Sequence, residues 1–278
     1  MNSLTLHAPA KINLLLRILG KRDDGFHELD TLMVKLPGLA DEIQFDASPE
    51  FSFACDDPSV PSDEHNLVVK AVRQFQEATG LPASYRILLR KTIPHGAGLG
   101  GGSSDAASTL LGLNRLYAHP LTEEKIQEIA SSLGSDVPFF LLPGAARCTG
   151  RGEKITPAPA PSPFRILLLK PAFGVPTPDA YRRWSQSKEI PGIRYAPQDL
   201  AGVQLTNDLE RPVFEKHRFL AELKQWLLTR NEIAAALLCG SGSTIFAALS
   251  DGADAKQITR AAQCELDPGL WSWSGLTS

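Results

Sequence analysis

The chain has little of what marks secreted, membrane or nucleic-acid-binding proteins. Its four cysteines form no Cys-x-x-Cys pair, so their spacing indicates neither a zinc site nor a disulfide framework, and a reducing cytoplasm fits best. No segment approaches the apolar length of a transmembrane helix. The apolar stretch near the N-terminus is interrupted by Lys11 and Asn13 and has no small-residue cleavage site after it, which argues against a signal peptide. We therefore expect a cytoplasmic protein.

A long block of one charge is also absent. The formal net charge is -3, so the composition indicates neither a nucleic-acid nor a membrane-surface footprint, and anionic ligands must be bound locally. Hydrophobic residues make up 43% of the 278 residues and charged residues 21%, which is typical of a globular protein with a sizeable core. This length predicts two lobes or one large two-layer domain. We expect a monomer or a weak homodimer.

What the sequence does have is glycine, concentrated in the segment PHGAGLGGGSSD at residues 94–105. Each glycine loses more backbone freedom on folding than any other residue, so a bound ligand is expected to compensate. A Walker A loop is excluded because Ser103, not Lys, follows the last glycine. The spelling G-x-G-x-x-G is present, but the preceding strand is half exposed and no acidic strand end follows about twenty residues later, so a dinucleotide fingerprint is excluded as well.

A third design fits this segment: a glycine loop wrapped around a nucleoside triphosphate at a helix N-terminus. Backbone N–H groups without Cβ crowding can approach phosphate oxygens, and the helix end adds partial positive charge. The hydroxyls of Ser103 and Ser104 are candidates to bind phosphate or its Mg²⁺. The alternative is a glycine-rich turn in which Ser104 is a plain N-cap.

The flanking pattern predicts alternating strands and helices. Period-two alternation indicates a strand through residues 10–19, which places Lys11 and Asn13 on one face, and the Asp24-Gly25 turn predicts a hairpin. A strand over 85–93 leads into the glycine loop. Helical patterns cover three segments, each with a start or stop signal: 66–79 closed by Gly80, the run after the glycine loop, and the run from Thr122 to Gly134.

The proline-rich segment PAPAPSP, residues 157–163, is the best linker candidate. Beyond it the pattern has the β-α-β-β-α-β order of a ferredoxin-like lobe. Its predicted elements are strand 165–170, helices near 198–210 and 218–229, strands 235–239 and 244–249, helix 253–264 and a short strand near Trp271.

The segment PHGAGLGGGSSDAA resembles the phosphate loop of the GHMP kinases, and PAKINLLL and LCGSGSTIFA match the other two motifs of that family in order and position. The resemblance spans the whole chain. It implies an α+β GHMP kinase fold, with a ribosomal-protein-S5-like N-terminal lobe over residues 1–157 and a ferredoxin-like C-terminal lobe over 163–278. It also implies an ATP-dependent phosphotransferase with an alcohol acceptor and with ATP and Mg²⁺ as cofactors.

The same resemblance implies catalytic roles for Lys11 and Asp136. Asp136 is expected beside Lys11, where it accepts or orients the proton of the attacking hydroxyl, while Asn13 helps to hold the acceptor. From the pattern alone, Lys11 and Asn13 are equally well read as solvated residues on an outward face. Asp136 alone is better read as an N-cap before a proline-started helix.

The combination AKINLLLRILGKRDDGFHEL, GSDVPFFL and NDLE is similar to the GHMP kinases that act on a cytidine diphosphate sugar alcohol. The resemblance implies a base-binding pocket made by Phe26, His27 and Tyr181, with Thr177 nearby. Similar kinases usually carry Tyr at the position of Phe26, so a hydroxyl contact is lost while the stacking face remains. Taken singly, these residues are better read as a core Phe, a turn His and a helix-face Tyr.

The expected ATP site is formed by the glycine loop, and Asn66 and Lys91 match positions on its adenosine side. An Asn at a helix start is otherwise usually a cap. The loop residues are Pro94, His95, Gly96, Ala97, Gly98, Leu99, Gly100, Gly101, Gly102, Ser103 and Ser104. A second glycine cluster, Gly240, Ser241 and Gly242, is expected to press against this loop, unless it is only a tight hairpin.

Two other functions fit these patterns. One is a GHMP kinase that acts on homoserine or a mevalonate-like alcohol, for which no cytosine platform is needed. The other is a nucleotide-binding module without catalysis, against which the retained Lys11, Asn13 and Asp136 argue.

Overall fold

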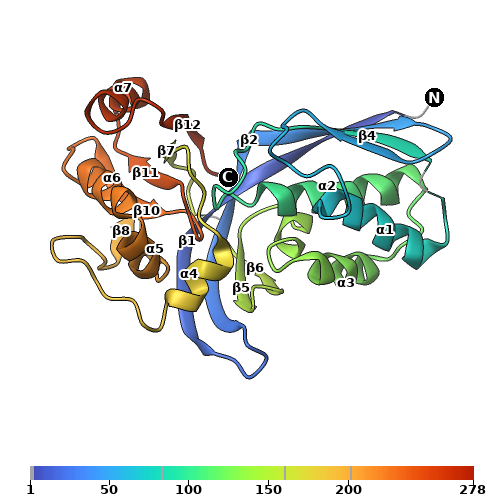
Figure 1. The fold of residues 1–278 in the computed structure, drawn as a ribbon, viewed down its shortest axis with the longest axis horizontal. Helices are drawn as coiled ribbons and strands as arrows, with labels where there is room; N and C mark the ends of the chain where they lie inside the picture. The colour runs from blue at the N-terminus through green and yellow to red at the C-terminus, as the bar shows by residue number, and fades with distance from the viewer. Residues whose placement is uncertain (1–2, 83, 160, 201) are drawn as a thin grey trace.

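The first half of the chain forms a mixed sheet with helices on one face (Figure 1). In this computed structural model, residues 3–82, 84–159, 161–200 and 202–278 are described. The order of strands in the main path of this sheet is β3-β4-β2-β1-β9-β8, and β5 and β6 extend β2. The elements of this half are β1 (Leu4–Lys21), β2 (His27–Ala47), β3 (Ser52–Cys55), α1 (Leu67–Thr79), β4 (Tyr85–Arg90), α2 (Gly101–Leu116), α3 (Glu123–Leu133), the 3-10 helix η1 (Pro138–Leu141), β5 (Ala146–Gly150) and β6 (Lys154–Pro157).

Several helix ends were predicted by the sequence and are confirmed. The side chain of Asn66 accepts a hydrogen bond from Val68 N at the start of α1, and Gly80 ends this helix with a φ of 69°. The hydroxyl of Thr122 caps α3 in the same way. The helix expected after the glycine loop begins earlier, at Gly101, behind Gly100 in the left-handed region. Ser104 is therefore inside the helix, and the alternative in which it is the N-cap is wrong.

The second half contributes a four-stranded antiparallel sheet of order β10-β11-β7-β12. Counted along the chain, these are the second, third, first and fourth strands, which confirms the predicted ferredoxin-like order. The elements are β7 (Arg165–Lys170), α4 (Thr177–Arg183), β8 (Gln198–Leu200), β9 (Val203–Asn207), α5 (Glu210–Lys216), α6 (Arg218–Leu228), β10 (Ile233–Leu238), β11 (Ile245–Leu249), α7 (Ala255–Glu265) and β12 (Trp271–Leu276).

The predicted helix over 198–210 is wrong. Strands β8 and β9 occupy this segment, with Gly202 at a φ of 82° between them, and residue 201 lies outside the described residues. Strand β9 pairs in parallel with β1 at Leu15 and Leu16, so this hairpin completes the N-terminal sheet. A contact with a strand nearly 200 residues away is invisible to local periodicity. The predicted linker 157–163 includes residue 160, which also lies outside the described residues.

Three apolar clusters hold these layers together. One lies between the N-terminal sheet and α1–α3 and includes Phe45 and Phe75. A second lies between the C-terminal sheet and its helices and includes Phe214. The third joins Ile12 and Leu14 of β1 to the inner face of the C-terminal sheet, where Phe246 packs. Because β1 is buried between both sheets, its polar side chains are held in fixed positions.

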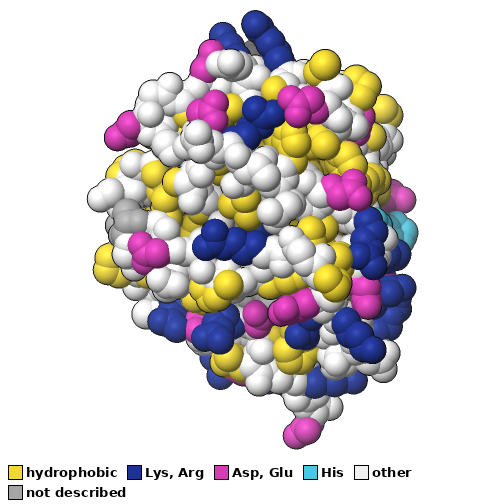
Figure 2. Space-filling view, turned by 90° about the vertical axis from the view of Figure 1, so that its left-hand side faces the viewer, with side chains coloured by type: hydrophobic (Ala, Val, Ile, Leu, Met, Phe, Trp, Pro, Cys, Tyr) yellow, Lys and Arg dark blue, Asp and Glu magenta, His cyan; other side chains and the backbone are white. Residues whose placement is uncertain are grey.

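The surface agrees with the mixed composition. On the outer face of the C-terminal half, basic and acidic side chains are interspersed over the surface (Figure 2). Within the described residues, no helix combines the length and the hydropathy needed to cross a bilayer.

Candidate active site

A cavity of about 910 Å³ lies where the glycine loop, the β1–β2 hairpin, α4 and the 240–242 loop meet. A cavity of this size fits a ligand much larger than a simple alcohol. Its walls include nearly all of the site residues predicted from the sequence; Ser104 and Gly242 are the two outside the lining. Those that line it are Lys11, Asn13, Phe26, His27, Asn66, Lys91, residues 94–103, Asp136, Thr177, Tyr181, Gly240 and Ser241.

The glycine loop is shaped by backbone conformation and close packing. Gly96, Gly98 and Gly100 have φ values of 65°, 76° and 74°, a region that strongly favours glycine. A Cβ on Gly98 would lie 2.0 Å from the carbonyl oxygen of Cys239, so a side chain is excluded there. The loop runs directly into the first turn of α2, whose N–H groups have no partner within the helix. This arrangement is suited to binding phosphate oxygens.

Lys11 is a buried cation in the wall of the cavity. Its Nζ donates to Asn13 Oδ1 at 2.7 Å and lies 3.4 Å from Asp136 Oδ2, so the structure places Asp136 beside Lys11. The backbone N of Lys11 also donates to the Leu99 carbonyl at 2.9 Å, which ties β1 to the glycine loop. Asn13 is fixed from its other end, because its Nδ2 donates to the hydroxyl of Thr31 at 2.8 Å. Lys11 and Asn13 are both buried, so the alternative in which they are solvated residues on an outward face is wrong.

Asp136 is the accessible carboxylate of this group. Its side chain is 39% exposed, whereas that of Lys11 is 4% exposed. The interpretation of Asp136 as a helix cap is wrong: Val137 occupies the N-cap position of η1 and has no capping side chain. The carboxylate therefore remains free to contact a ligand in the cavity.

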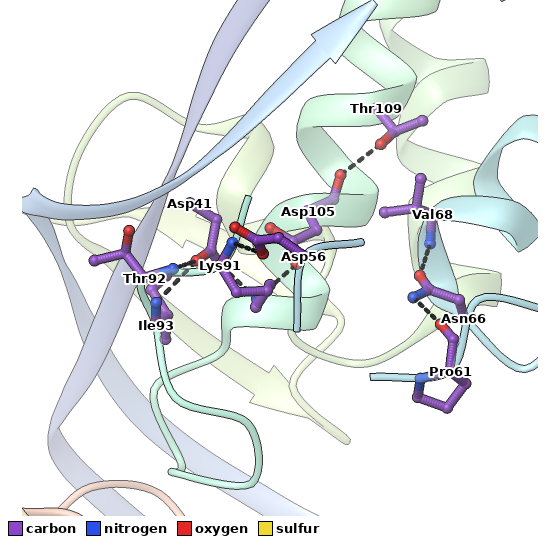
Figure 3. Close-up of polar contacts among 10 residues, drawn as sticks. All are labelled: Asp41, Asp56, Pro61, Asn66, Val68, Lys91, Thr92, Ile93, Asp105 and Thr109. Carbon is purple, nitrogen blue, oxygen red and sulfur yellow. Dashed lines mark hydrogen bonds and ion pairs between the residues drawn. The ribbon is translucent and has the colours of Figure 1, made fainter. Parts of the chain in front are cut away.

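Lys91 lies beneath the loop in a buried ion cluster (Figure 3). Its Nζ lies 2.5 Å from Asp41 Oδ2 and 2.9 Å from Asp105 Oδ2. Burial would lower the pKa of Lys91, but the two carboxylates outweigh it and raise this pKa. Burial raises the pKa of Asp105, an effect that Lys91 opposes and Asp41 reinforces. Asp41 also accepts from the backbone N of Thr92 and Ile93, so the cluster fixes the segment that enters the glycine loop.

Asn66 both caps α1 and lines the cavity. Its Oδ1 caps α1 and its Nδ2 donates to the Pro61 carbonyl at 2.7 Å (Figure 3). Within the cavity its amide is thus held in one orientation. Ser104 is fully buried, and its hydroxyl has no hydrogen-bond partner among the described residues, while Ser103 lines the cavity.

The far end of the cavity is aromatic. The ring centroid of His27 lies 5.4 Å from that of Tyr181 and 5.8 Å from that of Trp184. Burial, followed by the charge of Lys21, lowers the pKa of His27, so the neutral imidazole is favoured at pH 7. Phe26 is half exposed, and the guanidinium of Arg151 lies 4.7 Å from its ring centroid. The guanidinium of Arg151 therefore covers one face of the Phe26 ring, which was predicted to stack on the base.

The 240–242 loop presses against the glycine loop. Thr244 N donates to the Ala97 carbonyl at 3.2 Å, and a Cβ on Gly240 would lie 3.2 Å from Lys11 Nζ. The hydroxyls of Thr177 and Ser241 share a hydrogen bond of 2.8 Å, so α4 is joined to this loop. Gly242 lies outside the cavity lining, and a Cβ there would meet Leu238 and Val175.

Sequence reasoning missed several wall residues, among them Thr31, Arg151 and Trp184. Trp184 follows Tyr181 by three residues at the end of α4, and this helical spacing was available as a signal once a helix was recognised there. Thr31 reaches the cavity because β2 pairs with β1, and Arg151 reaches it because it lies in the β5–β6 turn. The local sequence has no signal for either placement.

Comparison with known proteins agrees with this geometry. Residues 66–144 match the family model "GHMP kinases N terminal domain" and residues 197–267 match "GHMP kinases C terminal". A 4-diphosphocytidyl-2-C-methyl-D-erythritol kinase of Methylacidiphilum infernorum is 42% identical over 281 residues, covering 97% of this chain and 95% of that protein.

Solved structures show the same fold. The crystal structure of a 4-(cytidine 5'-diphospho)-2C-methyl-D-erythritol kinase superposes with a TM-score of 0.80 at 35% identity and covers 99% of both chains. A homoserine kinase from Cytophaga hutchinsonii has a TM-score of 0.68 at 18% identity, with 100% of this chain and 95% of that chain covered. The latter likeness concerns the fold alone.

Proposed function

Because the chain belongs to the GHMP kinases, and within them to the family of 4-diphosphocytidyl-2-C-methyl-D-erythritol kinases, we propose that it phosphorylates this compound. The γ-phosphoryl group of ATP is transferred to a hydroxyl of the erythritol moiety, a step in non-mevalonate isoprenoid precursor biosynthesis. The observation that carries this proposal is a single cavity in which Lys11 and Asp136 lie between the glycine loop and an aromatic end.

The chemistry needs little from the protein beyond positioning and charge. The hydroxyl oxygen attacks the γ-phosphorus, the bond from this phosphorus to the ADP oxygen breaks, and the hydroxyl proton passes to the carboxylate of Asp136. Lys11, held by Asn13 at 2.7 Å, places a positive charge beside the transferring group. Asn13 is itself anchored on Thr31, so the acceptor-binding face is preorganised.

The donor is expected to bind with its phosphates on residues 96–103. Within the described residues, no cluster of three or more His, Cys, Asp or Glu side chains could hold a metal ion. Mg²⁺ commonly keeps several waters and binds through one or two protein oxygens together with substrate phosphates, so this wall fits the ion. Ser103 is the hydroxyl that would contact it or the phosphate. When bound, Mg²⁺ neutralises charge on the triphosphate.

The acceptor is expected to place its cytosine at the aromatic end. The neutral imidazole of His27 both donates and accepts, as the polar edge of cytosine requires. Tyr181 and Phe26 supply ring faces, and Lys21, Arg151 and Arg182 line the cavity near them. These cations suit the diphosphate of such a substrate. A homoserine or mevalonate kinase needs none of these groups.

The test is a panel of alcohols incubated with ATP and Mg²⁺, read by ³¹P NMR for the new phosphomonoester. The panel contains 4-diphosphocytidyl-2-C-methyl-D-erythritol, the same sugar alcohol without cytidine, homoserine and mevalonate. We expect transfer to the first compound, with Asp136→Asn as the inactive control. Transfer to homoserine or mevalonate instead would overturn the substrate, and ATP binding without any transfer would overturn the kinase activity.

A further inference from the structure

The segment Asn207-Asp208-Leu209-Glu210, called here the 207–210 segment, joins β9 to α5 and has no part in the mechanism above. It lies outside the cavity wall, and Asn207 and Glu210 are buried. All three of its polar side chains nevertheless bind backbone groups of elements that reach the cavity. Buried polar side chains are costly unless they are fully paired, so this arrangement calls for a reason beyond packing.

Asn207 holds the 240–242 loop directly. Its Nδ2 donates to the carbonyl of Leu238 at 2.8 Å and to that of Gly240 at 2.7 Å. Its Oδ1 accepts from Leu209 N at 2.9 Å. Both amide protons are therefore bound by backbone carbonyls, one at the end of β10 and one at the first residue of the 240–242 loop.

Asp208 ties the same segment to β1. Its carboxylate accepts from the backbone N of Ile18 at 2.8 Å, and its own backbone N donates to the carbonyl of Leu16 at 2.9 Å. Lys11 and Asn13 lie on β1 a few residues before Leu15 and Leu16, the residues that pair with β9. The register of β1 against β9 therefore affects where these two side chains lie.

Glu210 anchors the segment in the C-terminal core. Its Oε1 accepts from the backbone N of Leu238 at 3.0 Å, and its Oε2 lies 2.6 Å from Lys224 Nζ. The side chains of Glu210 and Lys224 are both almost fully buried. Both polar groups of Leu238 are thus bound by the 207–210 segment, one by Asn207 and one by Glu210.

The loop held in this way contacts the reacting groups. A Cβ on Gly240 would lie 3.2 Å from Lys11 Nζ and 3.5 Å from Asn13 Oδ1, so the Gly240 backbone packs against both side chains. We propose that Asn207 is a positioning residue for phosphoryl transfer: it fixes the 240–242 loop against Lys11 and the glycine loop. The catalytic effect of Asn207 rests on the proposed kinase activity. Its contact with the 240–242 loop does not depend on that activity.

The chain offers a matched control in Gln198. This side chain is also a buried amide that binds β10, since its Nε2 donates to the Ala236 carbonyl at 2.8 Å and its Oε1 accepts from Ala236 N at 3.1 Å. Ala236 lies on the same strand but precedes the loop. Asn207→Asp and Gln198→Glu each replace the donating amide with a carboxylate, so both are expected to lower Tm.

Only Asn207→Asp is expected to damage catalysis. A displacement of about 1 Å near the reacting groups costs about 10²-fold, so kcat should fall by about this factor while KM for the acceptor stays close to wild type. Gln198→Glu should keep kcat. If Asn207→Asp does not fold, Asn207→Ala, which removes the donor without adding charge, takes its place. Equal kcat values for the two variants would overturn the proposal.

A second measurement is independent of kinase activity. Cys239 is fully buried beneath the 240–242 loop, and its reaction with a maleimide can be followed by mass spectrometry beside that of exposed Cys264. We expect faster labelling of Cys239 in the Asn207 variant than in the Gln198 variant. Equal labelling would show that Asn207 does not hold the loop. A wild-type chain without kinase activity would overturn the proposed function and leave this comparison intact.

Discussion

The two ends of the cavity differ in whether backbone or side chains form their walls. The donor end, our name for the glycine-loop end where we propose that ATP binds, is formed by backbone: glycines at positive φ and the start of α2, pressed against a second backbone loop. The acceptor end, our name for the aromatic end where we propose that the cytosine binds, is formed by side chains: His27, Tyr181 and Trp184, with a guanidinium on Phe26. Backbone amides recognise phosphate without regard to what it is attached to, whereas rings and their polar edges select a particular base.

Asp136 and Lys11 stand between these ends, so they respond to both. The comparison leads us to expect that changes at the donor end affect every alcohol acceptor alike. Changes at the acceptor end should affect only the cytidine-bearing one. The largest effect is expected at Asp136, the residue common to both ends.

Asp136→Asn should lower kcat by about 10²–10⁴, because the amide cannot accept the hydroxyl proton. The side chain is 39% exposed and caps no helix, so Tm should remain near wild type. The measurement is steady-state ADP release together with a thermal melt. A loss of only a few-fold would remove the base from the mechanism.

Lys91→Met should lower the free energy of unfolding by about 3–5 kcal/mol, because it leaves the carboxylates of Asp41 and Asp105 buried without their cation. Urea unfolding measures the loss. Asp105→Asn is the matched control, since it leaves a one-to-one pair of Lys91 and Asp41, and it should cost far less. Similar losses for both variants would mean that unpaired buried carboxylates are not the cause of the loss in Lys91→Met.

Gly98→Ala should weaken binding of a non-hydrolysable ATP analogue by about 10- to 100-fold, because the new methyl group meets the Cys239 carbonyl and displaces the loop by about 1 Å. Calorimetric titration gives the Kd. Gly80→Ala has a similar φ, 69°, with no atom within 4 Å of the new Cβ, so it carries the backbone strain without the collision. The analogue should bind this control normally.

Tyr181→Ala should weaken binding of cytidine diphosphate by about 1–3 kcal/mol, which is about 5- to 150-fold in Kd. Phe26→Ala should have a smaller effect, since Arg151 already covers one face of that ring. Affinity for the ATP analogue should be unchanged in both. If Tyr181→Ala weakened both ligands equally, the division between the two ends would be lost.

The donor end and the helices packed behind it were the more predictable part. The glycine spacing of the loop, the helix caps at Asn66 and Thr122 and the helix stop at Gly80 are local features, and each is readable within a few residues. The start of α2 was missed because glycines are poor helix formers, and only the tertiary contacts of Gly98 and Gly100 make a helix begin there.

The acceptor end and the supports beneath the loop were harder to predict. Asp41 meets Lys91 across 50 residues because β2 pairs with β4. Arg151, in the β5–β6 turn, meets Phe26 because β5 pairs with β2. The proximity of Asp136 to Lys11 was expected only from a family resemblance. The β8–β9 hairpin was mistaken for a helix because its partner, β1, lies at the other end of the chain.

That parallel pairing of β9 with β1 bears on how ligands enter. A strand from the second half is hydrogen-bonded into the sheet of the first, and the two halves share an apolar cluster as well. Swinging one half away from the other would break both. The two halves are therefore expected to keep their relative position while ligands enter and leave.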